Sequence, residues 1–341
     1  MSLAITIEEI ARLAEVSRST VSRVLNNHPN VRPAVRDKVL RVVREQNYTP
    51  NAAARSLASN RSYAISLVIP GSTGAIFADP FFPQVIQGIS ETCNGAGYVL
   101  MLAMLTAEME QTFYNRMVGG KHFDGVIMLS SDVDDPLLPR LMREGTPLVL
   151  IGRHPYLEGL STVDSENFEG AREATAHLIG LGHRRVATIT GRLTMQSGVD
   201  RRDGYEQALL AAGLPLDPAL IVEGDYTQER GYRAMRQLLA LPRPPTAVFA
   251  GSDATAFGAQ RAIHEAGLRM PEDVALVGFD DVPAAAYANP PLTTMRQPSA
   301  ELGEQAVRVL LAHIEDPGRH PTAVRLPTAL VVRASCGAAS P

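Results

Sequence analysis

The amino-acid sequence predicts an all-α helix-turn-helix domain at the N-terminus, followed by an α/β core of two doubly wound parallel-sheet lobes. Three observations predict this. Short helical patterns fill residues 1–50, apolar strands alternate with helices from Tyr63 onward, and the two parts differ in charge. At 341 residues the chain is also too long for one simple core and suits two or three domains.

The net charge of −4 is distributed unevenly along the chain. Residues 1–62 hold ten Lys or Arg and five Asp or Glu, which gives +5 there and leaves −9 for the remainder. A basic head on an acidic body is typical of a polyanion-binding module joined to a separate domain.

The composition excludes several classes of protein. No apolar run reaches the roughly eighteen residues of a membrane helix, and the N-terminus has acidic residues where a signal peptide has an apolar segment. Cys93 and Cys336 alone cannot form a disulfide framework or a cysteine-rich metal site. We therefore expect a cytoplasmic protein with no metal and no cofactor.

Three short helices are predicted in the head. The first follows Thr6, which together with Glu9 fits a capping box. The second begins near Ser17, and the third begins at Pro33, a favoured first-turn residue, and runs to about Gln46. The inward positions at helical spacing are Ile7, Ile10, Ala11, Ala14, Val21, Val24, Leu25, Val35, Val39, Val42 and Val43. Two short helices joined closely, with a third packed behind them, indicate a helix-turn-helix.

Residues 51–62 read "NAAARSLASNRS" and are predicted to form a linker. Their alanines favour a helix, but isolated helices of this length are marginal in water. We expect this segment to become helical when a partner holds it.

From Tyr63 the chain alternates between strands and helices, which predicts parallel sheets covered on both faces. Two sheets fit better than one, because the segment around Asp164 resembles a crossing point. Strands are expected at "AISLVIP", "YVLMLAM", "GVIMLS", "PLVLIG", "RVATIT", "TAVFAG" and "VALVGFDD". Helices are expected near residues 82–95, 108–118, 136–143, 168–181, 204–212, 229–239 and 254–266.

Several segments, in order and at the right spacing, closely resemble the LacI/GalR family of transcriptional regulators. They are "TIEEIARLAEVSRSTVSRVLNNHPNVRPAVRDKVLRVVREQNYTPNAAARSLAS", "HLIGLGHRRVATITG", "RRDGYEQALLAAGL", "PTAVFAGSDATAFGAQRAI" and "VALVGFDDVPAAAYANPPLTTMRQP". The resemblance implies a DNA-binding domain at 1–50, a hinge helix at 51–62 and a periplasmic-binding-protein-like core at 63–341. Within that core it implies an N-lobe of about 63–162 and 294–323, and a C-lobe of about 163–293 and 324–341.

The resemblance assigns roles to residues of the head. In a helix-turn-helix the second helix enters the major groove, where Arg can bind guanine through two hydrogen bonds. The residues expected to contact bases are Arg18, Ser19 and Arg23. Those suited to phosphate contacts, which fix register, are Thr6, Ser17, Ser22 and Asn26. A solvated helix with incidental arginines is the alternative.

Leu57 occupies the position at which family members insert a leucine into the minor groove. Such an apolar wedge unstacks a base step and kinks the duplex. Two wedges, one per subunit, imply a homodimer on palindromic double-stranded operator DNA. The alternative is a leucine that packs the hinge against the core.

The resemblance also places a small-molecule effector between the lobes, at the carboxyl ends of strands. The expected contacts are Phe77, Asp79, Phe81, Arg201, Tyr226, Ser252 and Asp280. For Phe82, effector contact and core packing are equally favoured. Asp253 is expected to be structural, and Arg153 is expected to form a salt bridge near the cleft, with effector contact as the alternative.

An arginine with acidic and hydroxyl partners suits a neutral sugar, and "LVLIGRHP" resembles regulators of maltose-like and other α-glucoside systems. A purine or a phosphorylated metabolite is the alternative effector.

An enzyme is disfavoured because the sequence lacks the G-x-S-x-G, G-x-x-x-x-G-K and H-E-x-x-H motifs. A sugar-binding protein without DNA function would not carry a basic helix-turn-helix. The chain end after "LPTALVVRASCGAASP" adds no heptad segment, which favours a dimer over a tetramer.

Overall fold

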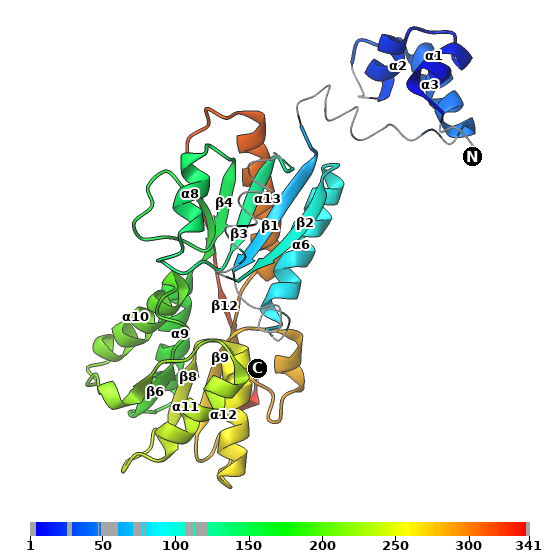
Figure 1. Cartoon of the computed structure of the whole chain (residues 1–341). Helices are drawn as coiled ribbons and strands as arrows, with labels where there is room; N and C mark the ends of the chain where they lie inside the picture. Colours follow the sequence, from blue (N-terminus) through cyan, green and yellow to red (C-terminus); the bar gives the residue numbers. More distant parts are fainter. Residues whose placement is uncertain are drawn as a thin grey trace. The chain divides into compact units, whose positions relative to one another are not determined.

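The structure is a computed structural model that describes residues 5–25, 29–46, 48, 61–70, 77, 79–106, 109, 112 and 122–338. The chain divides into two compact units, residues 1–62 and 63–341, and each is described by itself. Figure 1 shows the helices of the first unit and the two lobes of the second.

The first unit is the predicted helix-turn-helix. Its helices are α1 (Ile7–Leu13), α2 (Arg18–Leu25) and α3 (Pro33–Glu45). They enclose one small apolar core of Ile10, Ala11, Ala14, Val21, Val24, Val39 and Val42. The spacing of these residues along each helix explains why the three helices pack on one another. Between α1 and α2, Glu15 has a positive φ of 50°, which produces the sharp turn.

Two hydroxyl residues cap the helices of the head. Thr6 Oγ1 accepts a hydrogen bond from the Glu9 backbone N–H at the start of α1 (3.3 Å). Ser17 Oγ accepts one from the Thr20 N–H at the start of α2 (3.2 Å). Each bond satisfies a backbone donor that the helix itself leaves unpaired.

We expect Ser17→Ala to lower the free energy of unfolding of the head by about 1 kcal/mol, because the Thr20 N–H loses its acceptor. Chemical denaturation followed by circular dichroism measures this change. Ser19→Ala is the matched control, since Ser19 is exposed and contacts Ser17 only through its own hydroxyl. Equal unfolding midpoints for the two variants would contradict the capping role.

The second unit contains two six-stranded sheets, one in each lobe. The N-lobe sheet has the order β11-β5-β4-β3-β1-β2 and is parallel throughout. Its strands are β1 (Ala64–Pro70), β2 (Val99–Leu105), β3 (Gly125–Leu129), β4 (Leu148–Ile151), β5 (Ser161–Ser165) and β11 (Ala323–Leu326).

The C-lobe sheet has the order β12-β10-β9-β8-β6-β7 and is parallel except for β12, which runs antiparallel to β10. Its strands are β6 (Val186–Ile189), β7 (Ile221–Val222), β8 (Ala247–Ala250), β9 (Ala275–Asp280), β10 (Thr293–Arg296) and β12 (Ala329–Val331).

Helices cover both faces of each sheet, as the alternating pattern predicts (Figure 1). In the N-lobe, α6 (Phe81–Gly95) and α13 (Ser299–Glu315) pack on one face and α8 (Leu137–Arg143) on the other. In the C-lobe, α9 (Asn167–Gly180) and α10 (Gln196–Ala211) share one face, and α11 (Gln228–Leu239) and α12 (Asp253–Glu265) share the other. The short 3-10 helices are η2 (Pro218–Leu220), η3 (Pro283–Tyr287) and η4 (Ala334–Cys336).

Helices α6 and α13 approach closely because glycines lie at their contact. A Cβ on Gly88 would lie 1.9 Å from the Ala300 carbonyl oxygen, and one on Gly303 would lie 2.3 Å from that of Val85. Side chains at these two positions would force the helices apart.

Three differences from the predicted elements matter for the site. Helix α10 begins at Gln196, whereas the sequence predicted a start near Gly204. The earlier start was missed because the first turns of the helix are polar and show no apolar period. Helix α13 was not predicted, although its apolar residues have clear helical spacing. Residues 108–118, where a helix was predicted, lie almost entirely outside the described residues.

The chain passes between the lobes three times within residues 122–338: after β5, after β10 and between β11 and β12. These crossings lie a few residues beyond the lobe boundaries expected from the resemblance. Thus β5 belongs to the N-lobe through Ser165, β10 belongs to the C-lobe through Arg296, and β11 belongs to the N-lobe through Leu326.

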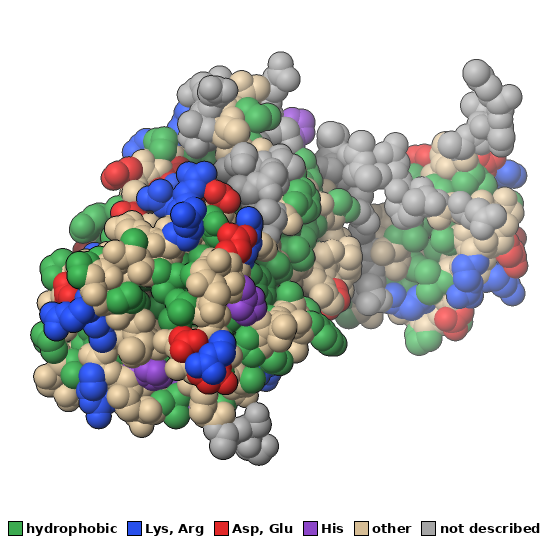
Figure 2. Space-filling view, turned by 90° about the horizontal axis from the view of Figure 1, so that it is seen from below, with side chains coloured by type: hydrophobic (Ala, Val, Ile, Leu, Met, Phe, Trp, Pro, Cys, Tyr) green, Lys and Arg blue, Asp and Glu red, His purple; other side chains and the backbone are tan. Residues whose placement is uncertain are grey.

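The surface of the C-lobe carries mixed charge. On the face shown in Figure 2, Lys and Arg side chains lie beside Asp and Glu side chains. The C-lobe has ion pairs between residues four positions apart in the sequence, such as Arg261–Glu265 on α12 and Arg269–Asp273 after it. None of the helices within the described ranges combines the length and apolar character that a membrane-spanning segment requires.

Candidate functional site

The residues expected to read DNA lie on the exposed side of α2. Arg18, Ser19 and Arg23 are exposed, whereas Val21 and Val24 on the opposite side are buried in the head core. The Arg18 Nε lies 3.2 Å from Glu8 Oε1. An exposed ion pair of this kind contributes about 0–1 kcal/mol, so it leaves the guanidinium available to a nucleic acid.

The residues expected to contact phosphates surround this face. Thr6 and Ser17 are exposed at the starts of α1 and α2, and Ser22 is half-buried on α2. The Ser17 hydroxyl lies 2.8 Å from that of Ser19 and 2.9 Å from that of Thr20. Asn26 and Leu57 lie outside the described residues.

A second candidate site, the interlobe cavity, has a volume of about 170 Å³. Segments that follow strands of both sheets line it, as expected for doubly wound sheets. Its polar lining residues are Asp79, Ser130, Ser131, Arg153, Asp164, Asn167, Arg192, Gln196, Ser197, Arg201, Asp225, Thr227, Ser252, Asp280 and Gln297. Its aromatic lining residues are Phe81, Phe82 and Tyr226.

Arg201 is at the centre of the polar lining. Its side chain is almost fully buried on α10, where Nε donates to Asn167 Oδ1 (2.8 Å) and Nη1 donates to the Gly251 carbonyl (2.5 Å). Nη1 also lies 3.8 Å from Asp280 Oδ1. The guanidinium carbon lies 3.7 Å from the ring centroid of Phe279, which supports it from one side. These contacts hold the guanidinium in one position.

Asp280 ends β9 and is also buried. Its backbone φ of 129° is in a region that favours glycine, so the surrounding structure holds a strained residue here. The Gln297 side-chain amide donates to Asp280 Oδ1 (2.6 Å). Burial raises the pKa of Asp280 well above its ordinary value, although the Arg201 charge opposes this shift. A hydrogen-bonding ligand would satisfy such a carboxyl group.

Tyr226 places an aromatic ring beside Arg201, whose guanidinium carbon is 5.7 Å from the ring centroid. Its hydroxyl lies 3.0 Å from that of Ser197, and burial raises its pKa. The ring fits because residue 191 is glycine, where a Cβ would lie 2.0 Å from Tyr226 Cζ.

The N-lobe contributes Asp79, Phe81 and Phe82 to the interlobe cavity. Asp79 Oδ1 accepts a hydrogen bond from the Phe81 N–H (3.0 Å), and burial raises the pKa of Asp79. The two phenylalanine rings pack edge to face, with centroids 5.8 Å apart. Phe77 differs from expectation, since its side chain is 61% exposed and does not line the interlobe cavity.

The side chains of Ser252 and Asp253 form hydrogen bonds within the C-lobe. Ser252 lines the interlobe cavity, but its hydroxyl caps α12 by accepting from the Thr255 N–H (3.1 Å). The Asp253 carboxylate accepts from the Val282 N–H (2.9 Å) and the Thr294 hydroxyl (2.5 Å). Burial raises the pKa of Asp253 to about 7.

Ion pairs join the two lobes at the rim of the interlobe cavity. Arg153 of the N-lobe forms the expected salt bridge, donating through Nε and Nη2 to the Asp200 carboxylate on α10 (2.9 Å for Nε). Arg192 of the C-lobe donates to Asp132 Oδ2 of the N-lobe (2.6 Å), and Thr194 Oγ1 donates to Oδ1 (2.7 Å). These contacts stabilise the observed lobe arrangement.

Asn167, Ser197 and Gln297 line the interlobe cavity and were not predicted from the sequence. Asn167 and Gln297 directly follow crossings between the lobes, and Ser197 lies in the unpredicted first turns of α10. The sequence carries little signal for Asn167 and Gln297, because the strands before them, STVDS and TTMR, are not apolar runs.

Comparisons with known proteins agree with this architecture. Residues 6–51 match the bacterial regulatory proteins of the lacI family, and residues 175–336 match the periplasmic binding protein-like domain. The regulator CelR of Thermobifida fusca is 41% identical over 332 residues, which are 97% of this chain and 98% of CelR. The ribose operon repressor of Escherichia coli strain K12 is 36% identical over 97% of this chain and 99% of the repressor.

Solved structures give the same result. The structure of a CelR–cellobiose complex has a TM-score of 0.78 at 39% identity and covers 97% of this chain and 99% of that one. The lac repressor dimer, bound to operator and the anti-inducer ONPF, has a TM-score of 0.82 at 27% identity and covers 98% and 100% of the two chains.

A helix-turn-helix head joined to a two-lobed core with a central polar cavity defines a DNA-binding transcriptional regulator. The chain belongs to the LacI family of bacterial regulatory proteins, whose members are regulators and not enzymes.

Proposed function

We propose that the protein is a repressor that binds a palindromic operator as a homodimer and releases it when a sugar binds in the interlobe cavity. The observation that carries the proposal is the fixed, buried guanidinium of Arg201 beside Asp280, with aromatic rings from both lobes in the same cavity. Guanidinium and carboxyl groups form hydrogen bonds with sugar hydroxyls, and aromatic rings stack on the apolar faces of sugars.

In the head, Arg18, Ser19 and Arg23 contact bases in this proposal, whereas Thr6, Ser17, Ser22 and Asn26 contact phosphates. The exposure of α2 supports these roles. In the core, Asp79, Phe81, Arg201, Tyr226, Ser252 and Asp280 contact the effector. The exposure of Phe77 argues against a contact from that residue in the observed lobe arrangement.

We propose a glucose-containing disaccharide as the effector. The similarity to CelR, whose structure contains the β-glucoside cellobiose, favours a β-linked disaccharide. The segment "LVLIGRHP" favours the α-linked maltose type as the second candidate. Effector binding would change the orientation of the lobes and thereby the ordering of the hinge, because a ligand shifts an equilibrium according to its affinity for each state.

The test uses the full-length protein and a duplex that the protein selects from a random DNA pool. Fluorescence anisotropy follows release of the duplex on addition of cellobiose, maltose, ribose or hypoxanthine. Release by cellobiose supports the β-glucoside proposal, and release by maltose alone supports the second candidate. Release by hypoxanthine alone, or tighter DNA binding with a sugar, contradicts the proposal.

Leu57, which lies outside the described residues, gives a separate prediction. We expect Leu57→Ala to weaken binding to the selected duplex by roughly tenfold or more and to leave binding to random duplex almost unchanged, because the wedge acts at the operator centre. The two affinities are measured by anisotropy, with Ser59→Ala as the control in the same segment. An equal loss on both duplexes would reject the wedge.

A further inference from the structure

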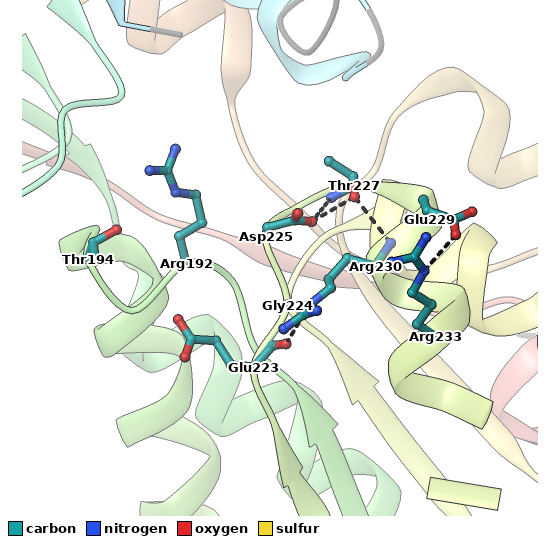
Figure 3. A pocket seen from close by; sticks show the side chains of 9 residues that line it. All are labelled: Arg192, Thr194, Glu223, Gly224, Asp225, Thr227, Glu229, Arg230 and Arg233. Carbon is teal, nitrogen blue, oxygen red and sulfur yellow. Dashed lines mark hydrogen bonds and ion pairs between the residues drawn. The ribbon is translucent and has the colours of Figure 1, made fainter. Parts of the chain in front are cut away.

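A second cavity, the outer pocket, lies on the C-lobe and has a volume of about 490 Å³ (Figure 3). It is lined by Arg192, Thr194, Glu223, Gly224, Asp225, Thr227, Glu229, Arg230 and Arg233. Arg192 and Thr194 follow β6 and stand on one side, and the segment from β7 into α11 forms the other side. The outer pocket therefore lies at the carboxyl ends of the two strands at one edge of the C-lobe sheet.

The outer pocket adjoins the interlobe cavity. Arg192, Asp225 and Thr227 line both. Tyr226, between two of these residues in the sequence, lines the interlobe cavity alone. A ligand that is longer than the interlobe cavity would therefore extend past Arg192 and Asp225 into the outer pocket.

Most charged groups of the outer pocket already have partners. Arg192 pairs with Asp132 (2.6 Å) and Arg233 with Glu229 (2.8 Å). Asp225 Oδ1 accepts from the N–H and hydroxyl of Thr227 (3.0 and 2.6 Å).

Arg230 is the exception among these arginines. The Nε of Arg230 donates to the Glu223 carbonyl at a long 3.4 Å, and no carboxylate of the described residues lies within ion-pair distance of its guanidinium. Figure 3 shows this side chain extending across the outer pocket toward Glu223 and Gly224. Its terminal N–H groups are donors that a ligand can use.

The charge of the outer pocket selects the chemistry of that ligand. Three arginines and three acidic residues line it, so it carries no net positive charge for a phosphate. Alternating donors and acceptors suit a neutral, hydroxyl-rich molecule. We propose that the outer pocket is a subsite for the additional sugar units of a longer oligosaccharide, whose first units occupy the interlobe cavity. This inference rests on the proposed function.

Isothermal titration calorimetry of the full-length protein tests the inference with the di-, tri- and tetrasaccharides of the cellobiose and maltose series. We expect the tri- or tetrasaccharide to bind about tenfold more tightly than the disaccharide of the same series, because charged groups form strong hydrogen bonds. Arg230→Gln should remove this gain and leave the disaccharide affinity within about twofold of wild type. Arg236→Gln is the matched control, because Arg236 is exposed on the same helix and does not line the outer pocket.

The outcomes separate the inference from the proposed function. If a disaccharide binds but longer sugars gain nothing, or if Arg230→Gln keeps the gain, the inference fails and the proposed function stands. If no sugar of either series binds, both fail. Saturable binding of inorganic phosphate that Arg230→Gln removes would assign the outer pocket to anions and also overturn the inference. An unchanged thermal unfolding midpoint shows that the variant is folded.

Discussion

Arg201→Met is expected to lower the affinity for the effector by about 100-fold or more while the protein still binds operator DNA. The substitution removes the guanidinium and leaves Asn167 Oδ1 and the Gly251 carbonyl without their donor in a buried site. Losing one partner of a buried, hydrogen-bonded charge pair costs about 2–5 kcal/mol. The variant should therefore repress without responding to the effector. Calorimetry measures effector affinity, and anisotropy measures operator affinity.

Arg202→Met is the matched control for this prediction. Arg202 is the next residue on α10, but its guanidinium pairs with Asp203 (2.6 Å) and does not line the interlobe cavity. Its replacement should leave effector affinity unchanged. Arg201→Lys should restore little, because an ammonium group cannot reproduce the planar fork of donors. Wild-type effector affinity in Arg201→Met would remove Arg201 from the site, provided that the variant is folded.

The second large effect concerns Asp164, near the end of β5. Burial raises the pKa of its carboxyl group from 3.8 to about 6, and the nearby Asp200 charge adds to this shift. In the unfolded chain this carboxyl loses its proton near its ordinary pKa, whereas in the folded protein it keeps the proton up to about pH 6. The folded state thus binds more protons between these values, so stability falls as pH rises through this window. The loss is complete above about pH 6 and amounts to about 3 kcal/mol.

Asp164→Asn isolates this effect, since the other buried carboxyl groups are present in both proteins. The amide keeps an oxygen that can accept from the Ser165 N–H and the Asn167 side chain. The free energy of unfolding of wild type minus that of the variant should decrease by about 2.4 kcal/mol from pH 4 to pH 7, because the unfolded carboxyl has already lost part of its proton at pH 4. Denaturant unfolding at several pH values measures this difference. Glu166→Gln, an exposed neighbour, is the control; a difference that stays constant with pH for Asp164→Asn would contradict the prediction.

Much of the fold could be predicted from the sequence because apolar spacing determined it. Ile10, Val21 and Val39 mark one face on each helix of the head, and the structure buries them together. Strands such as β1 and β3 are continuous apolar runs, which is the expected form of a strand buried on both faces. The first turns of α10 could not be predicted in this way, because their buried residues include the polar Asp200 and Arg201.

The residues of the interlobe cavity could be predicted where they matched the family. They were harder to predict where their role depends on packing. Arg201 and Asp280 were expected and are buried together. Phe77 was expected as an aromatic residue of the loop after the first strand, and its side chain is 61% exposed in the observed lobe arrangement. Asn167 and Gln297 acquire their roles by holding Arg201 and Asp280, and such supporting contacts become visible only when distant segments meet.

The three crossings between the lobes impose an order on biosynthesis. The N-lobe lacks α13 and β11 until residues 299–326 have been made, and by then the ribosome has produced most of the C-lobe. Until that point the apolar side chains of α6 that face α13, including Val85 and Ile89, lack their covering helix. A nascent chain that stalls or terminates before residue 299 would therefore release a product with an open apolar face, which is prone to aggregation and to capture by chaperones.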